Sequence, residues 1–332
     1  MQGPRESAPA RMRLVYWTRL SYARETLIDR LQGQPGIELQ VVDSLPALLA
    51  ALPGAQVLVL YDAPQDEAAQ VVAALRAPDA TVRWMHFISA GREGFEAAGL
   101  PVHLPVTYTV GCAAPVVAEH AMALLLALAR RMGDAHEATR ERRWELSLWQ
   151  SAQSVEGQCM VVVGFGRIGQ EVARRARAFG IDIVALSRSG APHALADRAR
   201  PLSELHAALG EADIVLVSIA LTAETHHLLD AAAFAACKRG ARIVNVARGG
   251  VIDQVALREA LRSGHLGGAG LDVADPEPLP ADDPLWDAPN LLVSAHVAGA
   301  GSPMTESRMA DNLSANIRRF MAGEALRHRV DS

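Results

Sequence analysis

The stretch CMVVVGFGRIG, from Cys159 to Gly169, is a short apolar run that ends in a glycine-spaced turn. The run is typical of a buried strand, and the QEVARRARAFG that follows has the apolar periodicity of a helix. In a βαβ unit, the G-x-G-x-x-G spacing places a pyrophosphate against the N-terminus of such a helix. Three glycines alone are weak evidence, because many turns use glycine for its dihedral freedom. The strand before and the helix after them favour a dinucleotide-binding site.

Two segments are predicted to contact the dinucleotide. The glycine loop contributes Gly164, Phe165, Gly166, Arg167, Ile168 and Gly169. The next predicted strand, 181–186, is followed by Ser187, Arg188 and Ser189. An NAD-binding unit carries an acidic residue at about Ser187, to bind the ribose hydroxyls. Two hydroxyls and a guanidinium suit a 2′-phosphate instead, so the sequence predicts NADPH in preference to NAD(H). The alternative, a solvated Arg188 and use of either cofactor, stays open.

Strands and helices alternate on both sides of this unit. The strands predicted before it are Arg13 to Trp17, Leu39 to Val42, Val57 to Leu60, Arg83 to Ile88 and Val102 to Leu104. Those predicted after it are Ile214 to Ile219, Arg242 to Val246, Gly268 to Val273 and Leu291 to Ser294. A buried apolar helix is expected from about Pro115, and an amphipathic helix from about Met304 to Met321. This alternation predicts parallel α/β sheets.

Bulk properties exclude several classes of protein. A chain of 332 residues suggests two domains, and a net charge of -5 gives no electrostatic case for nucleic acid or an anionic membrane. The cysteines, Cys112, Cys159 and Cys237, are odd in number and widely spaced, so neither a zinc site nor a disulfide framework is expected, and no metal is predicted. The N-terminal MQGPRESAPARM lacks the apolar segment of a signal peptide. A soluble, cytoplasmic protein is expected.

Three polar residues stand at or just after strand ends in the second half of the chain: Arg248, Glu277 and His296. In a doubly wound sheet such ends converge on one edge. An arginine can bind a carboxylate with two parallel hydrogen bonds, and a histidine can protonate a carbonyl oxygen. A glutamate beside the histidine would fix its tautomer. Each residue alone is more often structural, but the set after a dinucleotide motif favours catalysis.

The chain resembles the D-isomer-specific 2-hydroxyacid dehydrogenases, of the glyoxylate/hydroxypyruvate reductase type, over essentially everything after about residue 80. The matching segments are AAPVVAEHAMALLLALARR, VVVGFGRIGQEVARRARAFG, LTAETHHLLD, NVARGGVIDQVAL, GAGLDVADPEPLP and NIRRFMAGEAL. The resemblance implies that Arg248, Glu277 and His296 are catalytic. It also implies that Asp272 holds the nicotinamide carboxamide and that Ala247 lies in the cofactor site.

The resemblance also has implications for the fold and for substrate binding. A Rossmann-type doubly wound sheet, residues 105–297, would be inserted in a smaller flavodoxin-like domain made of residues 1–104 and 298–332. Ala90 and Gly91, in the segment SAGREGFE, would bind the substrate carboxylate through backbone N–H groups, together with Arg248. By spacing alone, this segment is equally compatible with an ordinary turn. A homodimer is expected, with the helix from Pro115 and an arm bearing Trp144 and Trp149 at the interface.

The sequence departs from the family pattern near the predicted site. Ser218 and Ala220 stand where histidine and proline are common, and Ala295 replaces a proline before the histidine. Arg92 and Glu93 follow Gly91 in the expected substrate loop. These changes leave the expected reaction type intact, which is reduction of a small 2-oxo acid to the D-2-hydroxy acid. They do not allow the particular substrate to be assigned. The competing hypothesis is a nucleotide-sensing binding protein on the same scaffold, without significant turnover.

Overall fold

The computed structural model describes residues 11–19, 21–101 and 103–330. The chain divides into two compact units. Unit 1 contains the described residues up to Cys112 and those from Ser302 onward, and unit 2 is Ala113–Gly301. Unit 2 is thus inserted in the sequence of unit 1. The functional domain limits expected from the sequence, 104/105 and 297/298, stay a prediction. Among the described residues, no helix is long and apolar enough to cross a membrane.

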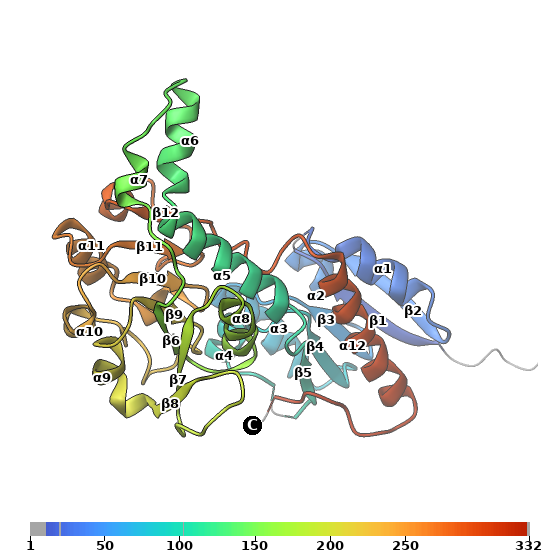
Figure 1. The fold of residues 1–332 in the computed structure, drawn as a ribbon. Helices are drawn as coiled ribbons and strands as arrows, with labels where there is room; N and C mark the ends of the chain where they lie inside the picture. Colours follow the sequence, from blue (N-terminus) through green and yellow to red (C-terminus); the bar gives the residue numbers. More distant parts are fainter. Residues whose placement is uncertain (1–10, 20, 102, 331–332) are drawn as a thin grey trace, which may run out of the picture. The chain divides into compact units, whose positions relative to one another are not determined.

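Unit 1 is built on a sheet of five parallel strands (Figure 1). Its strands are β1 (Met12–Trp17), β2 (Ile37–Val42), β3 (Val57–Leu60), β4 (Trp84–Phe87) and β5 (Val106–Tyr108), in the order β2-β1-β3-β4-β5. This is the flavodoxin-like order, in which the direction of strand addition reverses between β1 and β3. In open α/β sheets, ligands bind beyond the carboxyl ends of the strands at such a point.

Helices cover both faces of this sheet, which explains why its strand β3 is apolar and buried at every position. They are α1 (Arg24–Gln32), α2 (Leu45–Ala51), α3 (Gln65–Leu75), α4 (Glu93–Ala97) and α12 (Pro303–Met321). On one face, side chains of α2 and α3 pack with Val15 and Leu58 of the sheet. The C-terminal α12 packs beside α1, and its Phe320 ring lies 5.4 Å from that of Trp84. The last helix therefore completes the N-terminal unit.

Unit 2 is built on a second parallel sheet. Its strands are β6 (Cys159–Val163), β7 (Asp182–Ser187), β8 (Arg198–Pro201), β9 (Ile214–Val217), β10 (Arg242–Asn245), β11 (Gly268–Leu271) and β12 (Leu291–Val293), in the order β12-β11-β10-β9-β6-β7-β8. Numbered from β6, the first six strands have the Rossmann order 3-2-1-4-5-6, and β12 adds a seventh. The switch point lies between β6 and β9. Both predicted sheets, and the insertion of one domain in the other, are confirmed.

The two faces of this sheet bury separate cores. Val161 and Val163 of β6 pack on one side, against α9 (Leu205–Leu209), α10 (Ala231–Ala236) and α11 (Gln254–Arg262). Met160 and Val162 pack on the other, against α5 (Ala114–Ala129) and α8 (Arg167–Arg177). Alternate side chains of a strand point to opposite faces, so a strand covered on both sides must be continuously apolar. This explains the run at the start of the dinucleotide motif.

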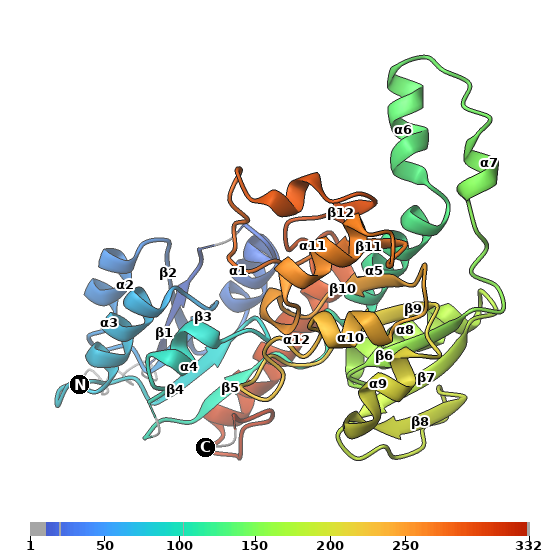
Figure 2. The ribbon, with the colours of Figure 1, turned by 90° about the vertical axis from the view of Figure 1, so that its left-hand side faces the viewer.

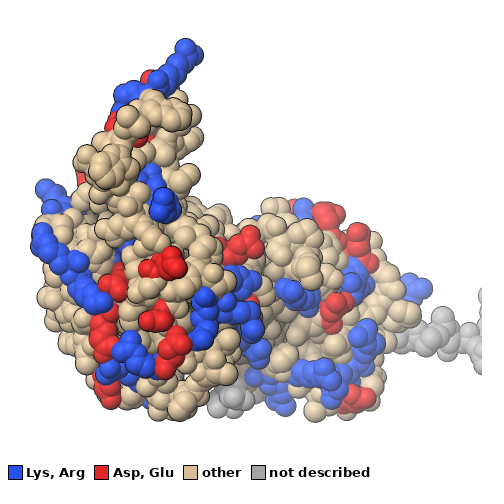
Figure 3. All heavy atoms as spheres, viewed as in Figure 1, with Lys and Arg blue, Asp and Glu red and all other residues tan. Residues whose placement is uncertain are grey.

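Short helical turns complete unit 2: α6 (Met132–Arg140), α7 (Leu148–Ser151), η1 (Leu202–Glu204), η2 (Gly249–Val251) and η3 (Pro284–Asp287). Figures 1 and 2 show that α6 and α7 form an arm that projects away from the sheet of this unit. Trp144, Leu146 and Trp149 of the arm are exposed to 90%, 67% and 76%. Uncharged side chains cover much of the arm below its charged tip (Figure 3). The arm thus presents an apolar surface.

Two strands differ from the sequence-based expectation. The fifth strand was expected at Val102 to Leu104, where Val102 lies outside the described residues. His103 and Leu104 form a turn, and β5 begins only at Val106, because Pro101 and Pro105 on either side cannot donate ladder hydrogen bonds. The edge strand β8 was not expected at all. It reads RARP and is exposed to half-buried, so it has no apolar run to reveal it.

Candidate active site

The glycine loop after β6 has the geometry that a dinucleotide requires. Gly164 has a φ of 92°, and a Cβ there would lie 2.5 Å from the Cα of Ile219. A Cβ on Gly169 would lie 2.5 Å from the Gly164 carbonyl oxygen, so this glycine lets α8 pack against the strand. Gly166, directly before α8, faces open space. The loop therefore leaves room for a pyrophosphate at the helix N-terminus.

Ser218, one of the departures from the family pattern, holds this loop from the neighbouring strand. Its Oγ donates a 2.7 Å hydrogen bond to the Gly164 carbonyl oxygen. Ser218 directly follows β9, so the bond crosses the switch point between β6 and β9. In the sequence, Ser218 stands out only as a departure from the family pattern, because nothing in the spacing indicates a partner 54 residues away.

The turn after β7 carries the three residues predicted to read the adenosine ribose. The Ser187 Oγ accepts a 3.1 Å bond from the Gly190 N–H, and the Ser189 Oγ accepts a 3.3 Å bond from the Ala191 N–H. Both hydroxyls thus shape the turn but can still donate their own hydrogens. Arg188 is exposed. The turn keeps a cation and two hydroxyl donors accessible at the strand end.

An acidic side chain lies near this cation. Glu224, on the loop after β9, accepts a 2.7 Å bond from the Thr222 hydroxyl. That bond, with a further contribution from the positive charge of Arg188, lowers the pKa of the Glu224 carboxyl. Glu224 is therefore ionised at neutral pH and partly balances the Arg188 charge. Sequence reasoning missed Glu224, which lies 36 positions further along the chain than Arg188.

The loop after β10 places Arg248 beside the loop that carries Glu277. A Cβ on Gly249 would lie 2.0 Å from the carbonyl carbon of Ala274, so only glycine allows this close approach. The Arg248 backbone is fixed by Asn245, whose side-chain amide donates a 3.0 Å bond to the Arg248 carbonyl oxygen. The Arg248 guanidinium donates to the carbonyl of Ala247, which is itself buried. The two loops are thus held together at the carboxyl edge of the sheet.

His296 and Glu277 form a direct pair. The His296 Nδ1 lies 2.8 Å from Glu277 Oε2, and the other carboxylate oxygen accepts a 3.0 Å bond from the Ala274 N–H. A carboxylate can only accept, so Nδ1 carries the hydrogen and the ring is oriented by the glutamate. The side chains of His296 and Glu277 are exposed to 49% and 38%, which leaves the ring accessible to a substrate.

The pair shifts the pKa of both members. The hydrogen bond to Glu277 raises the pKa of His296 above its ordinary value, against the desolvation of the ring and the positive charge of Arg248. Burial acts to raise the pKa of the Glu277 carboxyl, but the bonds from His296 and the Ala274 amide outweigh it and lower that pKa. His296 therefore remains protonated to a higher pH than a free histidine.

Asp272, which is expected to contact the nicotinamide, is 2% exposed. Both oxygens of its carboxylate accept hydrogen bonds from other groups of the protein. Oδ1 accepts bonds from the Ser294 hydroxyl at 2.8 Å and the Val297 N–H at 2.9 Å, and Oδ2 accepts one from the Ala298 N–H at 3.0 Å. The expected contact with the carboxamide stays a prediction. The observed bonds anchor the loop that bears His296.

The predicted substrate loop lies in unit 1, after β4. The carbonyl of Ala90 accepts a 3.2 Å bond from Arg92, and that of Gly91 accepts a 2.9 Å bond from the Ser89 hydroxyl. Arg92 also forms a 2.7 Å ion pair with Glu96 and lies over the ring of Tyr108. The cation that departs from the family pattern is therefore largely neutralised by its own helix.

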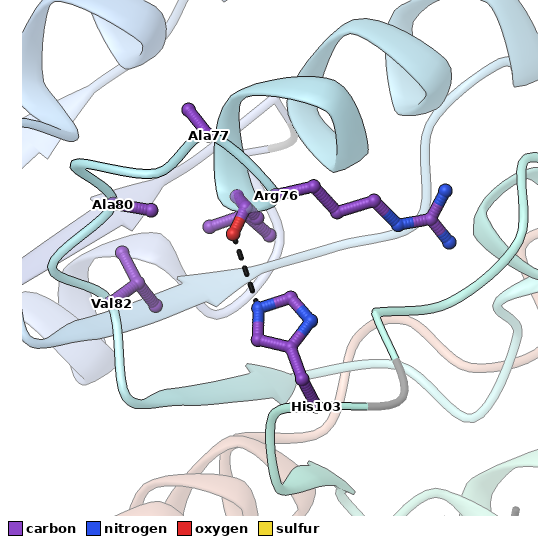
Figure 4. Close-up of a pocket in the computed structure, with 6 residues that line it drawn as sticks. Arg76, Ala77, Ala80, Val82 and His103 are labelled. Atoms are coloured by element: carbon purple, nitrogen blue, oxygen red, sulfur yellow. Dashed lines mark hydrogen bonds between the residues drawn. The ribbon is translucent and has the colours of Figure 1, made fainter.

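Unit 1 also contains a cavity of about 260 Å³. Figure 4 shows that His103 points toward the end of α3, where its Nε2 is 3.2 Å from the Leu75 carbonyl oxygen. Val82, which precedes β4, also lines the cavity. The cavity thus lies at the amino end of β4, opposite the edge where ligands of parallel sheets bind, and we do not place the substrate there.

A dinucleotide loop at the switch point and an arginine, a glutamate and a histidine at strand ends define a protein of the nicotinamide-dependent oxidoreductase class. Comparison with known proteins supports this class. Residues 122–298 match the family described as D-isomer specific 2-hydroxyacid dehydrogenase, NAD binding domain. The chain belongs to the D-isomer-specific 2-hydroxyacid dehydrogenase family.

Individual relatives carry different activities. A glyoxylate reductase of Korarchaeum cryptofilum is 40% identical over 225 residues, 66% of this chain and 67% of its own. A D-3-phosphoglycerate dehydrogenase of Mycobacterium leprae is 36% identical over 277 residues, 83% of this chain and 51% of its own, so the chain spans about half of that relative. A solved family member from Aeromonas salmonicida has a TM-score of 0.84 at 29% identity, and the match covers 97% of this chain and 99% of that one.

Proposed function

We propose that the protein reduces a small 2-oxo acid, of the glyoxylate or hydroxypyruvate type, to the D-2-hydroxy acid with NADPH as hydride donor. The observation that carries the proposal is the 2.8 Å pair of His296 and Glu277 at the carboxyl edge of the dinucleotide-binding sheet. The charge of Arg248 acts on both members of that pair. A histidine suited to donate a proton and a cation suited to bind a carboxylate thus lie at the sheet edge that also carries the glycine loop.

Each residue has a distinct role in this reaction. The Arg248 guanidinium binds the substrate carboxylate with its two-pronged donor set and so orients the 2-oxo group. A nicotinamide cofactor held at the glycine loop would supply the hydride for this reduction. His296 gives the proton on Nε2 to the carbonyl oxygen, since Nδ1 is held by Glu277, and solvent then restores that proton. Glu277 keeps the ring protonated and fixes its tautomer.

Two observations favour a small substrate over a phosphorylated one. A 3-phosphoglycerate-type substrate needs accessible cations for its phosphate, as binding of such groups relies on charge-assisted bonds. The Arg92 charge on the predicted substrate loop is paired with Glu96 within α4. The relative with the highest identity among those compared above is a glyoxylate reductase. We therefore favour a substrate without a phosphate.

The preference for NADPH rests on the turn after β7. Ser187, Arg188 and Ser189 offer donors to a 2′-phosphate, and none of them is a carboxylate that would bind a ribose 2′-hydroxyl. Glu224 works against this preference, because its negative charge lies near enough to Arg188 for the two to interact. We infer a preference for NADPH, with NAD(H) accepted less well.

We further propose that the protein forms a homodimer through the arm of unit 2. Trp144 and Trp149 are exposed to 90% and 76%, whereas tryptophans are ordinarily packed or placed in interfaces. We propose a second copy of the chain as the partner. In a C2 dimer, the arm of one protomer would cover the equivalent surface on the arm of the other. Burial of both rings on each side would remove most of this exposed apolar surface.

An assay of cofactor oxidation at 340 nm tests the proposed activity. Purified protein is mixed with NADPH or NADH and with glyoxylate, hydroxypyruvate, pyruvate or 3-phosphohydroxypyruvate, and the product configuration is determined by chiral chromatography. We expect the highest kcat/KM with glyoxylate or hydroxypyruvate, and a D product from the latter. Binding of NADPH without turnover of any of these acids would support the nucleotide-sensing alternative and refute the enzyme.

A further inference from the structure

The loop that bears His296 has a backbone that proline cannot adopt. Ala295 and His296 both have positive φ, 52° and 56°, a left-handed conformation that L-residues other than glycine rarely adopt. Proline is held near a φ of −65°, so the proline that is common before this histidine does not fit here. Because no proline restricts the backbone before His296, other contacts must hold this loop in its conformation.

Asp272 supplies most of this fixation. Its backbone carbonyl accepts the His296 N–H at 2.5 Å, and its carboxylate accepts the N–H groups of Val297 and Ala298. The residue before the strained pair, Ser294, donates its hydroxyl hydrogen to the same carboxylate at 2.8 Å. One buried aspartate thus contacts both ends of the segment that carries the proton donor.

Ser294 in turn contacts His120 on α5. The His120 Nε2 lies 2.7 Å from the Ser294 Oγ and 3.6 Å from Asp272 Oδ1. Because the Ser294 hydrogen goes to the carboxylate, its oxygen must accept, and His120 must carry a hydrogen on Nε2. The three groups form a directed chain, His120 to Ser294 to Asp272, from a long packed helix to the loop.

We propose that His120 and Ser294 are positioning residues that hold the proton donor His296 in place through Asp272. This inference rests on the proposed function of His296. The chain fixes the loop from the α5 side, while Glu277 orients the ring itself. Catalytic steps are sensitive to misplacement of about 1 Å, so loosening this chain should lower kcat more than it changes KM.

A double-mutant cycle separates positioning from a merely structural role. With glyoxylate or hydroxypyruvate and NADPH, Ser294→Ala and His120→Leu should each lower kcat about 10- to 100-fold, with KM changed less than about threefold. His120→Gln, which retains a donor at a similar distance, should recover part of the loss. In a His296→Asn background, Ser294→Ala should cause no further loss, because the group it positions is gone. Equal losses in both backgrounds would overturn the proposal.

A second readout does not depend on turnover. The ring resonances of His296, assigned by their absence in His296→Asn, are compared by NMR among wild type, Ser294→Ala and Ser263→Ala. Ser263 is the matched control, since its hydroxyl, at an exposed helix end, donates to the Ala260 carbonyl and accepts from the His265 N–H, both outside the His296 loop. We expect the His296 signals to shift or broaden in Ser294→Ala alone. If they stay unchanged, the positioning chain is wrong, whereas a wild type inactive on every 2-oxo acid would refute the proposed function instead.

Discussion

Glu277→Gln tests how the glutamate supports the proton donor. Glu277 accepts on both oxygens, from the His296 Nδ1 at 2.8 Å and from the Ala274 N–H at 3.0 Å. A glutamine has one acceptor oxygen, so one of the two bonds is lost and the other becomes neutral. A charge-assisted bond contributes about 1.5 to 3 kcal/mol when buried, and the partial exposure of this pair reduces that to about 1 to 1.5 kcal/mol. We expect kcat to fall about 5- to 12-fold.

The same substitution should shift the pH dependence of kcat in a defined direction. The bond to Glu277 raises the pKa of His296, and reduction needs the protonated ring, so activity is present below that pKa and is lost as the pH rises through it. Removing the carboxylate lowers the pKa, and the alkaline limb of the kcat profile moves to lower pH. The assay follows NADPH oxidation from pH 5.5 to 9.5, with Glu259→Gln, which changes an exposed side chain of α11, as control. An alkaline limb at the same pH in Glu277→Gln would refute the reasoning.

Three further predictions concern substrate, cofactor and assembly. Arg248→Lys should lower kcat/KM about 10- to 100-fold, because an ammonium cannot form the paired bonds; unchanged KM and kcat would remove Arg248 from the site. Wild type should have a higher kcat/KM with NADPH than with NADH, and Ser187→Asp with Arg188→Ala should reverse this; equal or better use of NADH by wild type would contradict it. Light scattering should give a dimer, and a monomer near 35.4 kDa after Trp144→Ser with Trp149→Ser; a monomeric wild type would exclude the interface.

Most of the fold could be predicted from the sequence because the strands are covered on both faces. A doubly covered strand such as β6 must be apolar at every position, and this gives a run that is visible without its neighbours. The edge strand β8 is covered less and reads RARP, so its sequence contains no such signal. The position of β5 depended on Pro101 and Pro105, whose effect on the ladder outweighed the apolar Val102 and Leu104 between them.

The residues of the candidate site that directly follow predicted strands could be predicted from the sequence. Arg248, Glu277 and His296 follow strand ends, and the carboxyl ends of parallel strands lie on one edge, so their proximity follows from topology. The chain from His120 to Ser294 joins residues 174 positions apart. Neither has a local pattern that indicates the other, because a hydrogen bond between a helix and a loop depends on how the helix packs on the sheet.

Glu224 shows the same limit at the cofactor turn. Its charge acts on Arg188 only because the loops after β7 and β9 approach each other in space. The sequence could therefore indicate the cation for a 2′-phosphate, but not the acid that opposes it. Glu224 could thus weaken a preference that the strand end alone indicates.

The central claim is that His296 supplies the proton in a reduction by NADPH. The most direct measurement compares wild type with His296→Asn, using the best 2-oxo acid for kcat and fluorescence titration for the Kd of NADPH. A general acid contributes about 10²- to 10⁴-fold to the rate. His296 lies outside the glycine loop around Gly164 that is predicted to bind the dinucleotide. We predict a loss of kcat on that scale with an unchanged Kd. A variant that retains more than half of the wild-type rate would contradict the account.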